Sequence, residues 1–139
     1  MPTAFLDSNV IVKYLRGDGA SARLFDRRVR SRVRLAINPI VLQELFAIAE
    51  VRRRPKLLGT LQKKLTVLPI DFARSAQMLT RVSGFRNQIA HSNDLLIFGS
   101  AADCDYLVTY DYDFATIPTE GRPKVVTPEQ LLEELEISA

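Results

Sequence analysis

The sequence contains few of the residues that form covalent cross-links or bind soft metal ions. Its 139 residues include one cysteine and one histidine. A single cysteine forms no disulfide within the chain. Because Cys104 lies in an apolar segment without a neighbouring histidine, we predict a buried free thiol rather than a catalytic one.

Long apolar runs are also missing. No apolar segment reaches the length needed to span a bilayer, and the first residues lack the basic start and apolar core of a signal peptide. We therefore expect a cytoplasmic protein without a membrane partner. With 47% hydrophobic and 25% charged residues and no internal repeat or low-complexity tract, the chain is expected to form one globular domain over residues 1–139.

Charged residues are distributed unevenly along the chain, although the formal net charge is only +3. Residues 16–64 contain thirteen lysines and arginines against four acids, whereas residues 100–139 contain two against nine. Two interpretations account for this pattern: solvated helix faces that differ in composition, or a basic rim that attracts a polyanion towards an acidic pocket. A basic stretch is only modestly specific to nucleic acid.

Short apolar runs alternate with segments of helical periodicity. We predict strands at residues 3–7, 34–38, 66–70, 106–109 and 124–127, and helices at residues 10–15, 20–33, 39–51, 56–65, 72–82, 95–104 and 129–136. Ser8 and Asn9 are expected to cap the first helix, and residues 83–84 to end the fifth. Because no hairpin signal joins two strands, the expected fold is an α/β three-layer sandwich with a central, mostly parallel five-stranded sheet flanked by helices.

Acidic side chains occur where several of these elements begin or end. Asp7 ends the first predicted strand, and Asp111 and Asp113 follow the fourth. Asp94 lies in the first turn of a predicted helix, where the helix dipole and free N–H groups favour an anion. Because the carboxyl ends of parallel strands meet at one edge of the sheet, we expect these carboxylates to converge there, where open α/β folds place their ligands.

Glu44 adds a carboxylate from another helix. It lies four residues after Ile40 and four before Ile48, so the helical repeat places it on the inward face. A buried carboxylate must be paired or metal-bound, because an isolated buried charge is costly. A nearby arginine, or a position at the margin of the apolar stripe, would also explain Glu44 without a functional site.

Each acid on its own has a plain structural explanation as a helix cap, a turn former or a partner of the helix dipole. Their coincidence at one edge of the sheet favours a shared site. Several carboxylates in one cleft repel one another unless a cation joins them. Oxygen ligands without histidine or cysteine select Mg²⁺ or Mn²⁺ rather than zinc. We expect His91 to be a loop residue with a local hydrogen bond, outside the site.

Four segments resemble, in their order and spacing, the motifs of PIN-domain ribonucleases, especially the VapC-type toxins of prokaryotic toxin–antitoxin pairs. They are Phe5-Leu-Asp-Ser-Asn-Val, Val41-Leu-Gln-Glu-Leu, Ser92-Asn-Asp-Leu-Leu-Ile and Leu107-Val-Thr-Tyr-Asp-Tyr-Asp-Phe. The resemblance covers nearly the whole chain. The family usually has Thr in place of Ser8, a polar or basic residue in place of Tyr110 and a smaller residue near Phe98, and these differences leave the acidic set intact.

The resemblance implies a metal-dependent endoribonuclease that hydrolyses RNA phosphodiester bonds and leaves a 5′-phosphate and a 3′-hydroxyl. The implied metal-binding and catalytic acids are Asp7, Glu44, Asp94 and Asp111, with Asp113 as an accessory ligand and Asn9 and Thr109 as polar supports. The expected cofactor is Mg²⁺ or Mn²⁺. A VapB-like antitoxin whose tail covers the acidic pocket, and a second copy of the toxin in a homodimer, are the implied protein partners.

The basic stretch between residues 23 and 34 supplies candidate contacts for the RNA backbone. We assign this role to Arg27, Arg28 and Arg30, which are expected on the outer face of their helix. Phosphate contacts of this kind position a nucleic acid without selecting its sequence. The stretch therefore predicts a polyanionic substrate and does not define the RNA target.

Two alternative functions remain open. A PIN-like module without catalytic activity would bind RNA or protein, although the presence of all four acids argues against it. A haloacid-dehalogenase-like phosphatase would also begin with an aspartate at the end of a strand. That enzyme class needs a second aspartate where this chain has Asn9, together with a suitably placed lysine that the sequence lacks.

Overall fold

The structure is a computed structural model that describes residues 1–82, 92–117, 119 and 121–136. Its sheet consists of β1 (Thr3–Leu6), β2 (Arg34–Ile37), β3 (Thr66–Val67), β4 (Tyr106–Val108) and β5 (Lys124–Val126). All neighbouring strands pair in parallel, in the order β3-β2-β1-β4-β5. The predicted parallel sheet is confirmed, and each strand begins at the expected residue and ends one to three residues earlier.

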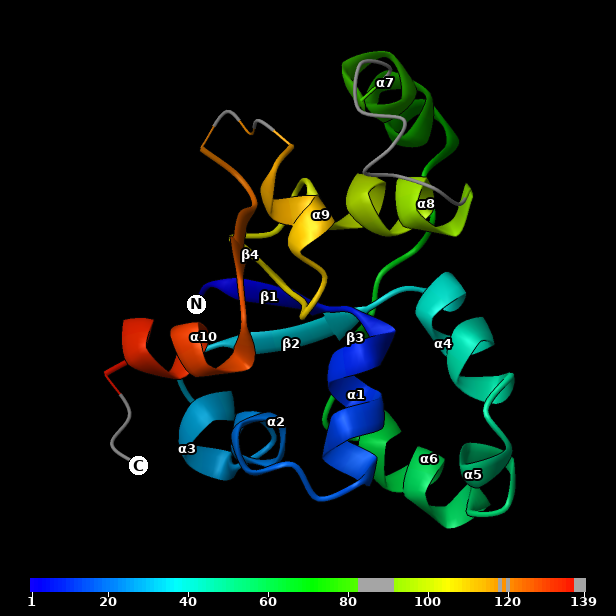
Figure 1. Ribbon diagram of the computed structural model, residues 1–139, viewed down its shortest axis with the longest axis vertical. Helices are drawn as coiled ribbons and strands as arrows, with labels where there is room; N and C mark the ends of the chain where they lie inside the picture. Colours follow the sequence, from blue (N-terminus) through cyan, green and yellow to red (C-terminus); the bar gives the residue numbers. More distant parts are fainter. Residues whose placement is uncertain (83–91, 118, 120, 137–139) are drawn as a thin grey trace.

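Helices cover both faces of this sheet (Figure 1). They are α1 (Ser8–Leu15), α2 (Gly19–Leu24), α3 (Arg27–Arg30), α4 (Pro39–Phe46), α5 (Ala49–Arg52), α6 (Pro55–Gln62), α7 (Phe72–Val82), α8 (Ser92–Ala101), α9 (Tyr112–Ala115) and α10 (Pro128–Glu134). Figure 1 shows α1, α2 and α3 on one side of the sheet and α7, α8 and α9 on the other. Crossover connections between parallel strands are nearly always right-handed. Connections that run across the sheet in opposite directions therefore place their helices on opposite faces. The predicted three-layer sandwich is the result.

The strand order reverses at β1, in the centre of the sheet. From β1 the chain adds β2 and then β3 on one side. It then crosses back to add β4 on the other side of β1, and β5 follows as the last strand of the sheet. Leu6 and Val108 are paired at the carboxyl ends of β1 and β4, and the Asp7 N–H donates to the Val108 carbonyl oxygen at 3.0 Å. Open parallel sheets bind ligands at such a reversal. Here the reversal brings Asp7 beside Thr109.

Strands β1 and β4, whose carboxyl ends lie at this reversal, are apolar on both faces. Ala4, Phe5 and Leu6 of β1 are fully buried, as are Leu107 and Val108 of β4. Continuous apolar runs are typical of parallel strands covered by helices on both faces. The packed core therefore fixes the ends of these strands, and with them the first polar side chains at the carboxyl edge of the sheet.

Two predicted helices are each divided in the structure. The segment predicted at residues 20–33 forms α2 and α3, with Asp26 extended between them (ψ 148°). The segment predicted at residues 39–51 forms α4 and α5, with Ile48 extended between them (ψ 121°). Periodicity does not detect such breaks, because the apolar residues on either side keep helical spacing and still reach the core, as Phe25 and Val29 do.

Some predicted helix ends also differ from the structure. Asp7, rather than Ser8 or Asn9, is the N-cap residue of α1, and the short helix α9 was not expected. The predicted helix end at residues 83–84 and the predicted loop residue His91 lie outside the described residues. Within the described ranges, no helix is both long and apolar enough to span a membrane.

Cys104 is a free, buried thiol, as predicted. Burial is the main cause that raises its pKa to about 11, with smaller contributions from the negative charges of Asp103 and Asp105. The reactive form of cysteine is the thiolate. Because almost none of this thiol is ionised at neutral pH, Cys104 contributes packing rather than chemistry.

Candidate functional site

Asp7 is a buried carboxylate between β1 and α1. Only 6% of the residue is exposed. Its Oδ1 accepts a hydrogen bond from the Ser8 backbone N–H at 2.7 Å, at the N-terminus of α1. Its Oδ2 accepts hydrogen bonds from the Thr109 hydroxyl at 2.8 Å and from Asn9 Nδ2 at 3.3 Å. Groups that follow β1 and β4 thus hold the carboxylate in one orientation.

Thr109 and Asn9 connect this carboxylate to the turn after β4. The buried Thr109 hydroxyl oxygen accepts hydrogen bonds from the Asp111 N–H at 3.0 Å and from Asn9 Nδ2 at 3.3 Å. The Asn9 Oδ1 accepts a hydrogen bond from the Tyr110 N–H at 3.3 Å. Because the other neighbours of the Thr109 hydroxyl are themselves donors, its single hydrogen is directed to Asp7.

The pKa of Asp7 is raised above its ordinary value of 3.8. Burial is the largest cause, because the charged form loses hydration, and the negative charges of Asp94 and Asp111 act in the same direction. Hydrogen bonds from Thr109 and Ser8 lower the pKa without cancelling the increase. Ionised Asp7 therefore destabilises the fold, and a cation beside it would relieve this destabilisation.

Thr109→Val is expected to raise the pKa of Asp7 further, because valine keeps the shape of threonine and removes a hydrogen bond that favours the carboxylate. With a raised carboxyl pKa, the folded state binds more protons than the unfolded state at pH values between the two pKa values. Stability therefore falls as the pH rises from the unfolded pKa through the folded one. This interval begins near pH 3.8 and should extend to higher pH in the variant.

Denaturant unfolding in EDTA across this pH range measures the difference. Thr116→Val is the matched control, because it removes an exposed threonine hydroxyl that donates to the Asp113 carbonyl oxygen at 2.8 Å and does not contact Asp7. The control should keep the wild-type pH dependence. A Thr109→Val protein that also keeps it would show that this hydroxyl does not influence the ionisation of Asp7.

Asp111 and Asp113 lie in the turn that follows β4, and they differ in their surroundings. Asp111 is half-buried and caps α9 by accepting a hydrogen bond from the Asp113 N–H at 2.9 Å. Asp113 is exposed, and its hydrogen bonds to other described residues involve only its backbone. The structure therefore brings Asp111 into the network around Thr109 and leaves the Asp113 carboxylate at the surface.

Glu44 and Asp94 approach the same edge of the sheet from two further helices. Glu44 is half-buried on α4, and its Oε1 is inaccessible to solvent. Asp94 is half-buried in the first turn of α8, and its negative charge contributes to the raised pKa of Asp7. Helices α4 and α8 also contact each other. The four acids that the resemblance assigns to metal binding thus lie on elements that meet near the carboxyl edge.

Asn38 is fully buried and joins these two helices. Its Oδ1 caps α4 by accepting a hydrogen bond from the Val41 N–H at 3.0 Å. Its Nδ2 donates to the Leu96 carbonyl oxygen at 3.2 Å and to Ser100 Oγ at 2.9 Å, both on α8. In the sequence, an asparagine between a strand and a proline indicates only a helix cap. The contact with α8, close to Asp94, was therefore not predicted.

Comparison with known proteins identifies the family. Residues 4–120 match the PIN domain. The chain belongs to the PIN-domain family. No curated protein matches the sequence.

Solved structures of toxin–antitoxin complexes have a similar fold. VapBC2 from Rickettsia felis, bound to a DNA fragment from its promoter, is 19% identical, with 88% of this chain and 96% of that chain covered and a TM-score of 0.69. DNA-bound VapBC from Salmonella typhimurium is 21% identical, with 92% and 99% covered and a TM-score of 0.65. A toxin–antitoxin complex from Klebsiella pneumoniae is 21% identical, with 90% and 97% covered and a TM-score of 0.62. At these identities the similarity establishes the fold.

The acidic side chains of this PIN domain have the chemistry that a metal ion requires, but those in the described residues do not form a compact cluster. Among the described residues, no three acidic, histidine or cysteine side chains lie close enough together to hold an ion. Carboxylate oxygens suit hard ions such as Mg²⁺ and Mn²⁺. The raised pKa of Asp7 marks a position where positive charge would be stabilising. The chemistry of these residues therefore fits a divalent cation.

The arginines predicted to contact RNA lie at the opposite edge of the sheet in this PIN domain. Arg27, Arg28 and Arg30 belong to α3, which leads into the amino end of β2 (Figure 1). Arg27 and Arg28 are exposed, whereas Arg30 is half-buried and its Nε donates to the Phe25 carbonyl oxygen at 3.0 Å. The structure does not bring these arginines together with Asp7.

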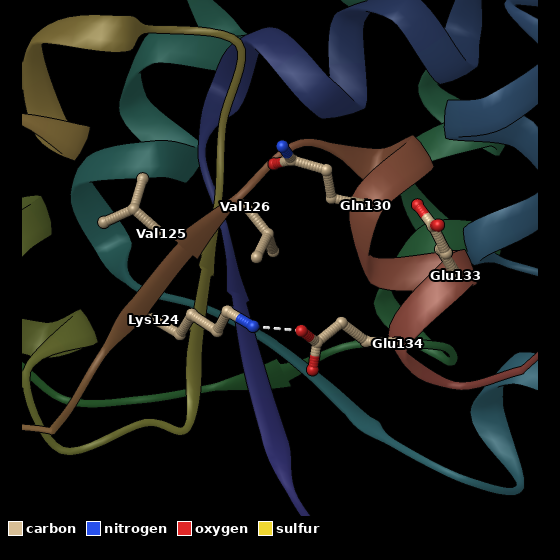
Figure 2. Close-up of a pocket in the computed structure, with 6 residues that line it drawn as sticks. All are labelled: Lys124, Val125, Val126, Gln130, Glu133 and Glu134. Atoms are coloured by element: carbon tan, nitrogen blue, oxygen red, sulfur yellow. Dashed lines mark hydrogen bonds and ion pairs between the residues drawn. The ribbon is translucent and has the colours of Figure 1, made fainter.

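A separate surface pocket of about 420 Å³ lies between β5 and α10 (Figure 2). Lys124 and Glu134 form an exposed ion pair across it, and their mutual hydrogen bond raises the pKa of Lys124 and lowers that of Glu134. Exposed pairs of this kind contribute little to stability. None of the predicted metal-binding acids lines this pocket, whereas Asp111 and Thr109 line a smaller one of about 120 Å³.

Proposed function

We propose that this PIN domain is a metal-dependent endoribonuclease and the toxin of a type II toxin–antitoxin system. The observation that carries the proposal is the environment of Asp7. This carboxylate is buried, held by Thr109 and Asn9, and subject to the negative charges of Asp94 and Asp111. Acids whose ionisation is disfavoured by burial and by like charges are typical of functional sites.

A divalent cation, Mg²⁺ or Mn²⁺, would be held by Asp7, Glu44, Asp94 and Asp111, with Asp113 as an accessory ligand. When bound, such an ion activates water and stabilises charge on a phosphate. Carboxylates bind metals in their deprotonated form. The hydrogen bonds from Thr109 and Ser8 favour that form of Asp7 and so oppose the effect of burial. No side chain is required to act as a covalent nucleophile.

The structures of similar fold support a protein partner. The Rickettsia felis and Salmonella typhimurium structures are VapBC complexes bound to DNA, and the Klebsiella pneumoniae structure is a toxin–antitoxin complex. We therefore extend the proposal to a VapB-like antitoxin that covers the acidic edge of the sheet, and to a homodimer of the toxin. Co-expression with the product of an adjacent small reading frame should yield a stable complex in which RNA cleavage is inhibited.

RNA cleavage is expected to require Mg²⁺ or Mn²⁺ and to stop in excess EDTA, because the bound ion would generate the attacking hydroxide and stabilise charge on the phosphate. The assay uses purified protein with total cellular RNA, so that a narrow target is present in the mixture. Cleaved ends should carry a 5′-phosphate, and activity should return when the ion is restored. Equal cleavage in excess EDTA would contradict the metal mechanism.

A PIN module that binds RNA without cleaving it is the second candidate. The family match is the same for such a module, which would use its surface without binding a metal ion. The same assay distinguishes the two candidates when RNA binding is measured in parallel. Binding in EDTA, together with intact RNA after addition of Mn²⁺, would select the module without catalytic activity.

A further inference from the structure

A cleft of about 200 Å³ lies at the amino edge of the sheet, and each charged side chain among the described residues that line it is positive. The four cations that line it are Arg30, Arg34, Lys63 and Lys64. They come from three parts of the chain: α3, the first residue of β2, and the segment between α6 and β3. We refer to this surface as the basic cleft.

The charges of the basic cleft are not neutralised within the described part of the protein. None of the four cations forms an ion pair there. Asp105 is an acid at the same edge, but it accepts a hydrogen bond from the Thr3 N–H at 2.8 Å and lies 4.0 Å from Arg122. Four like charges around one cleft repel one another, and a bound anion would relieve this repulsion.

The basic cleft and the acids lie at opposite edges because the strands are parallel. Arg30 and Lys64 precede β2 and β3, whereas Asp7 and Asp111 follow β1 and β4. The amino ends of all the strands share one edge and the carboxyl ends share the other. The four residues of β1 separate the two edges by about 13 Å. A single small anion cannot contact both edges, whereas a chain of linked phosphates can.

We propose that the basic cleft binds the phosphate backbone of RNA, as a second contact for the substrate away from the point of cleavage. This inference rests on the proposed ribonuclease function. Charge complementarity identifies the ligand as a polyanion. No aromatic side chain is among the described residues that line the cleft, so bases have no stacking platform there. The contact is expected to be with phosphates, whatever the RNA sequence.

The variant Arg34→Gln/Lys63→Gln/Lys64→Gln tests this site, because it removes three charges without breaking an ion pair. Arg30 is retained, since its hydrogen bond to the Phe25 carbonyl oxygen contributes to the fold. RNA affinity in EDTA at about 0.1 M salt should fall roughly 10- to 100-fold. The salt dependence of log K should decrease by up to about 2, at roughly 0.7 per lost phosphate contact on a single strand.

A matched control distinguishes an effect of the basic cleft from an effect of the protein's net charge. Arg53→Gln/Arg54→Gln/Lys56→Gln removes the same charge from exposed residues elsewhere and should change the affinity less than about threefold. Exchanging Lys and Arg at the three cleft positions keeps the charge and should preserve binding. Melting temperatures of all the variants confirm that they are folded.

Binding in EDTA separates this inference from the ribonuclease proposal. If the cleft variant binds RNA more weakly and the control variant does not, the RNA-binding role of the basic cleft is supported. This holds even if the protein cleaves no RNA after addition of Mn²⁺. Equal binding by the cleft variant and the control overturns the inference and leaves the ribonuclease proposal intact. A polyglutamate peptide that binds in place of RNA, and loses its binding in the same variant, would also overturn the assignment to RNA.

Discussion

Asp7→Asn is expected to reduce RNA cleavage at least about 100-fold, because even the outer-shell partners of a metal typically contribute 10- to 100-fold. The amide keeps the oxygen that accepts from the Ser8 N–H and loses the charge that would bind the ion. The melting temperature in EDTA should change little, since two effects oppose each other. The amide nitrogen that replaces Oδ2 no longer accepts hydrogen bonds from Thr109 and Asn9, but a buried charge with a raised pKa is removed.

The Mn²⁺-dependent rise in melting temperature should also disappear in Asp7→Asn, because the rise reflects binding to the folded state. Asp113→Asn is the matched control, since it makes the same chemical change at an exposed carboxylate. Because Asp113 is exposed, its substitution should reduce cleavage less than Asp7→Asn does. An Asp7→Asn protein that cleaves RNA at the wild-type rate would remove Asp7 from the catalytic set.

Asn38→Ala is expected to lower the free energy of unfolding by about 3 kcal/mol. The loss of the helix cap to Val41 costs about 1 kcal/mol. Each of the two hydrogen bonds that the Asn38 amide donates, to Leu96 and Ser100, contributes about 1 kcal/mol more. In a chain of 139 residues this loss corresponds to a decrease of roughly 10 °C in melting temperature.

Asn38→Ser separates the two roles of this residue. Serine keeps an oxygen that caps α4 and removes the amide that bonds to α8, so the expected loss is about 2 kcal/mol. Because α4 carries Glu44 and α8 carries Asp94, both variants should also show a weaker thermal response to Mn²⁺. Urea unfolding in EDTA measures the stability terms. An Asn38→Ala protein as stable as the wild type would show that this contact does not hold the helices together.

Several features of this protein could be predicted from local sequence because they depend on local physics. A parallel strand buried on both faces must be apolar throughout, so each short apolar run marked a strand. Carboxylates at or shortly after the ends of such strands lie near the carboxyl edge of the sheet, which accounts for the positions of Asp7 and Asp111. Before α7, Asp71 Oδ1 accepts a hydrogen bond from the Arg74 N–H at 3.0 Å, a local contact of the kind that short polar residues make at helix starts.

Helix continuity was not determined by the local pattern. Asp26 and Ile48 interrupt two predicted helices. The apolar residues before and after each break keep the spacing of a single helix, so the periodic signal is the same with or without the break. Packing against the rest of the protein decided where the backbone turns.

Contacts between distant residues were decided by the tertiary structure alone. Asn38 bonds to residues 58 and 62 positions further along the chain, and this contact exists only because α4 and α8 pack together. The basic stretch was evident in the composition, but its position relative to Asp7 was not. Arg27 and Arg28 precede a strand and Asp7 follows one, so the shared direction of the strands places them at opposite edges of the sheet. Composition records how much charge a segment carries, whereas strand direction and packing decide where that charge faces.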